Sequence, residues 1–118
     1  MLTMTESEYD TRVGRHESFL MAQDGQFLGT LTSNKYQFDS IMNPYGRYGS
    51  KYSSTSIFNQ YGRYGGRFAQ YSPFNPYTRT PPKIIFKGNC IGLLTLNKNI
   101  THRLNPEDLF CWMRNKKL

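Results

Sequence analysis

Cysteine, histidine and acidic side chains are scarce in this chain of 118 residues, and long apolar runs are missing. No stretch approaches the roughly 18 consecutive apolar residues of a membrane-spanning helix, so we expect no membrane span. The polar, acidic segment 1–18 lacks the apolar run of a secretory signal, which predicts a leader on a cytoplasmic protein. The remaining residues, 19–118, predict one small domain. Cys90 and Cys111 have apolar neighbours, which predicts buried free thiols.

The scarce residue types also argue against catalytic and metal chemistry. Neither His16 nor His102 has a Cys, Asp or His at metal-ligand spacing, so we expect no metal and no cofactor. The sequence contains no nucleophile elbow and no phosphate-binding loop, and Asp39 is the one carboxylate within residues 33–80. We therefore expect no catalytic residues and no enzyme.

Charge is distributed unevenly along the chain. Residues 1–32 carry a net charge of −3, whereas residues 33–80 and 81–118 each carry +5. The middle segment has six Lys or Arg against Asp39 alone. Such a basic surface favours an anionic partner, or it serves only solubility, and the charge alone does not choose between them.

A 16-residue unit occurs three times in the middle of the chain, at 33–48, 49–64 and 65–80. Ser, Asn, Tyr and Arg recur at fixed positions in it: Ser40, Ser56 and Ser72; Asn43, Asn59 and Asn75; Tyr45, Tyr61 and Tyr77; Arg47, Arg63 and Arg79. A fixed period indicates one structural unit used repeatedly. Dense Gly, Ser and Asn-Pro predict ordered loops or short hairpins anchored by Ile, Phe and Tyr, with disorder as the alternative.

The candidate binding residues of the repeats are arginines flanked by tyrosines: Tyr45, Arg47, Tyr48, Tyr61, Arg63, Tyr64 and Arg79. Tyrosine rings and guanidinium planes suit single-stranded nucleic acid or nucleotides, but Arg–Tyr stacks between successive units would produce the same pattern without a ligand. Equal spacing and flanking predict that Arg47 and Arg63 lie on one exposed face in the same local environment.

A second repeat surrounds the first. Residues 25–35, GQFLGTLTSNK, are echoed by GNCIGLLTLNK at 88–98. Apolar runs before each copy and glycine at each turn predict two β-hairpins, 19–32 and 83–96, paired in one sheet. Gly29 and Gly92 recur inside the second strands, which indicates a bulge or a close backbone approach.

The C-terminal segment 105–116 is predicted to be a helix. Asn105 suits the N-cap, Pro106 suits the first helical position, and Leu109, Trp112 and Met113 form an apolar stripe for packing on the sheet. The expected fold is therefore mainly β: two hairpins flanking three loop or hairpin repeats, with one C-terminal helix.

The motifs DGQFLGTLTSN, SIMNPYGRYGSKYSSTSIFN and SPFNPYTRTPPKI resemble those of a widespread group of uncharacterised bacterial proteins. That group carries a DGxYLGxLxxN segment followed by tandem NPYGxYGSxYSxxSI units, and the resemblance spans about residues 20–98. It implies a shared repeat-built fold and no particular activity. The third unit departs from the pattern at Thr78-Arg79-Thr80, as expected of a terminal repeat.

The expected function is a non-catalytic binding or scaffold module. Its basic, tyrosine- and arginine-rich repeat face would contact a protein or an anionic partner, nucleic acid among them. The alternative is a small hydrolytic or nuclease-like enzyme. A deep pocket joining His102 to a carboxylate would favour the enzyme, and an exposed Tyr/Arg face would favour binding.

Overall fold

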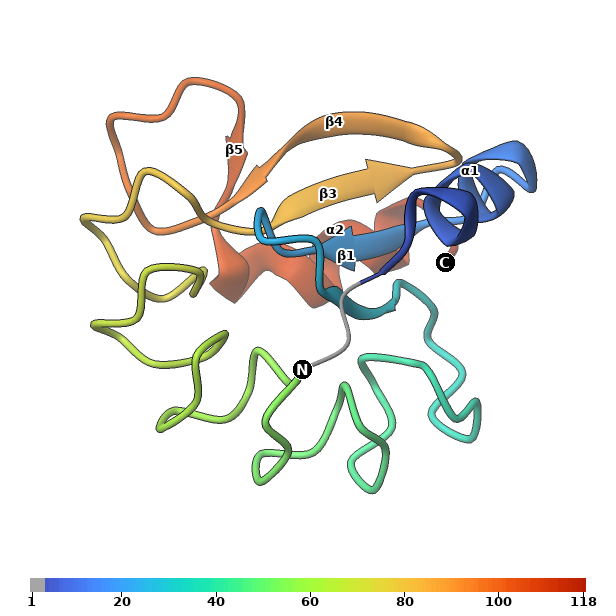
Figure 1. The fold of residues 1–118 in the computed structure, drawn as a ribbon, viewed down its shortest axis with the longest axis horizontal. Coiled ribbons are helices and arrows are strands. Elements are labelled where there is room, and N and C mark those ends of the chain that lie inside the picture. Colours follow the sequence, from blue (N-terminus) through green and yellow to red (C-terminus); the bar gives the residue numbers. More distant parts are fainter. Residues whose placement is uncertain (1–3) are drawn as a thin grey trace.

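Five strands form one sheet on one side of the molecule, and a long segment of turns runs along the other side (Figure 1). The computed structural model describes residues 4–118. Its elements are α1 (Glu6–Gly14), β1 (Phe19–Met21), β2 (Phe27–Thr30), β3 (Lys83–Phe86), β4 (Asn89–Leu94), β5 (Arg103–Leu104), the 3-10 helix η1 (Pro106–Asp108) and α2 (Leu109–Asn115). The strand order is β2-β1-β3-β4-β5.

The two predicted hairpins lie side by side in this sheet. β1 pairs antiparallel with β2 and also with β3, where Leu20 lies opposite Ile84. β3 pairs antiparallel with β4, and the short β5, which the sequence analysis did not predict, adds a parallel fifth strand. After β2 the chain leaves the sheet, and it returns at β3, which pairs with β1 on the side opposite β2.

Alternate side chains of β1 and β3 enter two apolar clusters, one on each face of the sheet. Leu20 and Ile84 lie in the larger cluster together with Leu109 and Met113 of α2. Phe19 and Ile85 lie in the smaller cluster, against which Tyr9 and Val13 of α1 pack. The period of two is the normal consequence of a pleated strand with both faces covered. Part of the segment expected to be a leader thus packs on the sheet as α1; residues 1–3 lie outside the described part of the chain.

Both strand glycines occur at bulges, as predicted. The β1–β2 register shifts where β2 contains Gly29, and the β3–β4 register shifts beside Gly92. Gly29 has φ +118°, and a Cβ on it would lie 2.5 Å from Ile41 Cγ2. A Cβ on Gly92 would lie 2.7 Å from the carbonyl oxygen of His102. The bulges therefore lie where other parts of the chain come close to the sheet: the Ile41 side chain at Gly29 and the His102 backbone at Gly92.

The C-terminal helix begins as expected, because the Asn105 side chain accepts a hydrogen bond from the Glu107 amide over 2.9 Å. Trp112 packs edge-on against Phe86, with ring centroids 5.5 Å apart. The prediction for the cysteines is wrong. Cys90 and Cys111 are free but exposed, since the first residues of β4 face solvent and α2 buries Leu109 and Met113 instead.

Residues 33–80, called the turn region below, form a chain of consecutive β-turns rather than hairpins. The carbonyl of Ser50 accepts a hydrogen bond from the Ser53 amide, and the carbonyl of Ser53 accepts one from the Ser56 amide. The same three-residue step continues as far as Gly62. The carbonyl of Gly62 then accepts a hydrogen bond from the amide of Gly66, four residues later. Four steps of three and one of four give the 16-residue spacing. Each turn reverses the chain locally, so the segment projects as successive small loops (Figure 1).

Asparagine and serine side chains close these turns by accepting from the amide two residues ahead. The donors for Asn43, Asn59 and Asn75 are the amides of Tyr45, Tyr61 and Tyr77, at 3.0–3.1 Å. The same asparagines donate to a carbonyl six residues earlier. Helix and strand each account for only 17% of the described residues, so the sheet and the C-terminal helix are observed without a mainly β composition.

Candidate functional site

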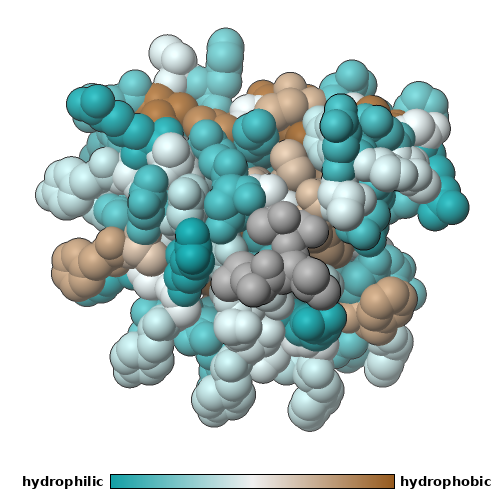
Figure 2. Space-filling model, in the orientation of Figure 1, coloured by the Kyte–Doolittle hydropathy of each residue, from teal (hydrophilic) through white to brown (hydrophobic). Residues whose placement is uncertain are grey.

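The surface of the turn region carries seven exposed aromatic rings. Phe38 stands alone, and the other six fall into two sets, each spaced by 16 residues. The first set is Tyr36, Tyr52 and Phe68, and the second set is Tyr45, Tyr61 and Tyr77. The exposed fractions of these six rings run from 81 to 95%. Pale side chains of intermediate hydropathy project from the lower edge of Figure 2, and brown ones project at the left and right sides above it; Figure 1 places the turns along this part of the molecule. Isolated exposed rings are ordinary, whereas repeated ones on one segment make that segment a candidate for binding.

Each ring of the first set has a cation directly before it in the sequence and close to it in space. Lys35 Nζ lies 5.6 Å from the centroid of the Tyr36 ring, and Lys51 Nζ lies 5.5 Å from that of Tyr52. Arg67 Cζ lies 5.7 Å from the centroid of Phe68. These are cation–π distances, and in solvent each pair holds a positive charge next to an open ring face.

Two of the predicted binding tyrosines point inward. Tyr64 is fully buried, and its hydroxyl donates to Asp24 Oδ2 over 2.7 Å, which connects the turn region to the first hairpin. Burial, together with that hydrogen bond, raises the pKa of the Tyr64 phenol above its ordinary value of 10.0. Tyr48 is half-buried against Phe27, and burial raises its pKa as well. Neither ring lies among the exposed ones.

The three predicted arginines remain exposed but differ in their contacts. Arg63 Nε lies 3.4 Å from Asp24 Oδ2, and its guanidinium lies 5.1 Å from the centroid of Tyr71. Within residues 4–118, Arg47 and Arg79 have no ion pair. The prediction of identical surroundings for Arg47 and Arg63 is therefore wrong, because among the three arginines Asp24 of the hairpin turn pairs with Arg63.

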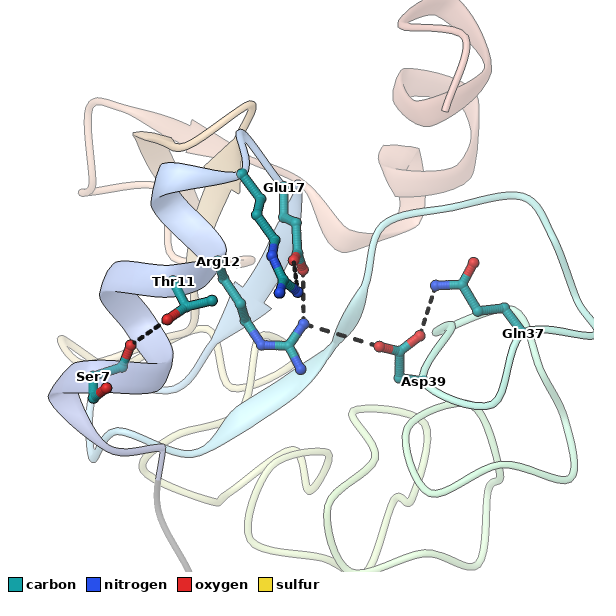
Figure 3. A network of polar contacts seen from close by, with 7 residues as sticks. Ser7, Thr11, Arg12, Glu17, Gln37 and Asp39 are labelled. Carbon is teal, nitrogen blue, oxygen red and sulfur yellow. Dashed lines mark hydrogen bonds and ion pairs between the residues drawn. The ribbon is translucent and has the colours of Figure 1, made fainter.

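Asp39, the single carboxylate of the turn region, faces Arg12 of α1 (Figure 3). Asp39 accepts from Gln37 Nε2 over 2.7 Å, and its other oxygen lies 3.9 Å from Arg12 Nη1. Arg12 also bonds Glu17 at 2.8 Å and stacks on Phe27. Because Asp39 is buried, the exposed surface of the turn region carries six Lys and Arg and no carboxylate from the same segment.

A groove of about 670 Å³ lies between the second and third units. Tyr61 and Phe68 are among its lining residues, its apolar lining also includes Ile57, Phe58 and Phe74, and Arg67 is the one charged residue among those described. This groove was not predicted from the sequence. The signal that was available is the three-residue spacing of Asn, Ser or Gly in the repeats, which predicts successive turns but not the groove between them.

The surroundings of His102 bear on the enzyme alternative. A smaller groove there is lined by Ile84, Trp112 and residues 101–104 among others, and no Asp or Glu is among its described lining residues. Within the described chain, no three His, Cys, Asp or Glu side chains are grouped to hold a metal. None of the helices in residues 4–118 has the length and apolarity needed to cross a membrane.

Comparison with protein-family models, with curated proteins and with solved structures found no match to this chain.

Proposed function

We propose that the protein is a non-catalytic binding module whose turn region contacts an anionic polymer. The observation that carries this proposal is the combination of seven exposed rings with six Lys or Arg on one segment whose only carboxylate is turned toward α1. Aromatic faces and flexible cations together favour a ligand with alternating planar and anionic groups.

The arrangement of the backbone supports the same proposal. Asn or Ser side chains hold the turns that carry the five exposed tyrosines, and a backbone bond from Ala69 to the Gly66 carbonyl closes the turn that carries Phe68, which keeps these rings on ordered backbone. Ordered backbone reduces the conformational entropy lost on binding. The alternative of a hydrolytic or nuclease-like enzyme has less support, because the described groove beside His102 contains no carboxylate partner.

The test compares two triple variants that change the net charge equally. Lys35→Gln, Lys51→Gln and Arg67→Gln remove the cations beside the first set of rings. Lys98→Gln, Lys116→Gln and Lys117→Gln remove three exposed cations from outside the turn region. Binding to heparin and to the oligonucleotide dT16 is measured by fluorescence anisotropy over a salt series.

We expect the turn-region variant to bind dT16 more weakly than the wild-type protein. The slope of log K against log salt should become shallower by roughly 2, because each of the three lost phosphate contacts contributes about 0.7 to that slope. The variant outside the turn region should change the slope much less. Equal slopes for both triples would attribute binding to net charge alone, and a wild-type protein that binds neither polymer would refute the proposal.

A further inference from the structure

We propose that the groove between Tyr61 and Phe68 is a pocket for a base of single-stranded nucleic acid. This inference rests on the proposed function and assigns a ligand class to it. The groove is bounded by two rings that are 90% and 87% exposed and so remain open to stacking. At about 670 Å³ it falls in the size range of sites for small planar ligands.

The second and third units differ from the first at the residues that shape this groove. Gly66 and Ala69 line it, where the first junction has Ser50 and Ser53. Ser50 accepts from the Tyr52 amide, and Ser53 donates to the Arg47 carbonyl, so the first junction carries two hydroxyls. Gly66 and Ala69 leave an apolar surface instead, which suits the face of a base.

Polar groups at the groove suit the rest of a nucleotide. Arg67 lines the groove beside Phe68 and supplies a cation for a phosphate. Gln60, which also lines it, occupies the place of Pro44 and Pro76 in the other units. An amide offers both a donor and an acceptor to a base edge, whereas proline offers neither from its side chain. No Asp or Glu is among the described lining residues to repel a phosphate.

A single strand fits these features better than a duplex. Its bases are unpaired, so each presents a face for stacking and an edge for hydrogen bonds. A duplex presents stacked bases and would meet the rings only through its backbone. The same rings could stack on a sugar ring, and the experiment separates that outcome.

The experiment compares dT16 with an abasic 16-mer that has the same phosphodiester backbone and no bases. Heparin is the third probe. The groove variant carries Tyr61→Leu and Phe68→Leu, and the matched control carries the repeat-equivalent changes Tyr45→Leu and Tyr52→Leu, which lie outside the groove lining. All four rings are exposed, so thermal melting should be unchanged in both variants.

We expect the wild-type protein to bind dT16 at least about tenfold more tightly than the abasic strand, as stacking of one base implies. The groove variant should lose most of this preference and keep its affinity for the abasic strand and heparin, while the control keeps the preference.

Three results would overturn the base pocket and leave the proposed function standing. These are equal binding of both strands by the wild-type protein, an equal loss of preference in both variants, and a loss of heparin affinity in the groove variant without any base preference. The last would assign the groove to sugar rings. Absence of binding to all three probes would instead refute the proposed function.

Discussion

At the scale of single residues, one asparagine in each unit holds two turns together. Asn59 accepts from the Tyr61 amide and donates to the Ser53 carbonyl, both over 3.1 Å. Asn43 and Asn75 make the equivalent pairs of bonds. Asparagine carries a separate acceptor oxygen and donor nitrogen on a short side chain, so one residue reaches both the amide two positions ahead and the carbonyl six positions back.

We predict that Asn59→Ala lowers the free energy of unfolding by about 2 kcal/mol, because it removes both bonds and leaves the partly buried Ser53 carbonyl without this partner. The control is Gln60→Ala next to it, an exposed position that should change stability by less than about 0.5 kcal/mol. Urea denaturation measures both. Equal effects of the two substitutions would contradict the role assigned to Asn59.

At the scale of elements, the sequence predicted what local periodicity encodes and missed what tertiary packing decides. The hairpins followed from apolar runs around glycine turns, and the C-terminal helix followed from Asn105 and Pro106 at its start. α1 was missed because its sequence is mostly polar, although Thr5 caps it by accepting from the Glu8 amide. The inward orientation of Tyr64 could not be predicted, since it depends on Asp24, which is 40 residues away.

The bulge in β2 leads to a prediction for the stability of a Gly29 variant. Gly29→Ala should lower the free energy of unfolding by more than about 3 kcal/mol, because φ +118° is unfavourable for alanine. The new Cβ would also lie 2.5 Å from Ile41 and 2.8 Å from Tyr48 Cβ, both in the turn region. Gly14→Ala is the control, since nothing lies within 4 Å of that position in α1 and alanine favours helix. If thermal melting shows similar losses for both, the turn region does not pack on Gly29 as described.

At the scale of the whole molecule, the turn region is attached to the sheet by apolar and polar contacts. Ile41 and Ile57, one unit apart, are both in the larger apolar cluster. The polar attachments are Arg12 to Asp39 at the first unit, Tyr64 to Asp24 at the second, and Asn97 to the Thr78 carbonyl over 2.8 Å at the third. Each unit thus has its own attachment, which leaves the opposite surface of the turns available for a partner.

The attachment of Tyr64 to Asp24 makes stability depend on alkaline pH. Burial and the hydrogen bond raise the pKa of the folded-state phenol above its ordinary value of 10.0, so the protonated phenol stabilises the folded protein. This contribution is complete below pH 10 and is lost as the pH rises toward the folded-state value, because the unfolded chain then releases the proton first.

We therefore predict that the free energy of unfolding falls between pH 8 and pH 10.5, with about 1 kcal/mol of the fall due to Tyr64. Tyr64→Phe should be less stable than wild type at pH 8, by about 1 kcal/mol for the lost hydrogen bond, and should lose less stability on going to pH 10.5. Tyr61→Phe, at a 90% exposed ring, is the control and should retain the wild-type pH profile. Urea denaturation at both pH values measures the difference. Parallel pH profiles for wild type and Tyr64→Phe would show that the phenol ionises equally in both states, and the turn region would then not depend on this buried contact.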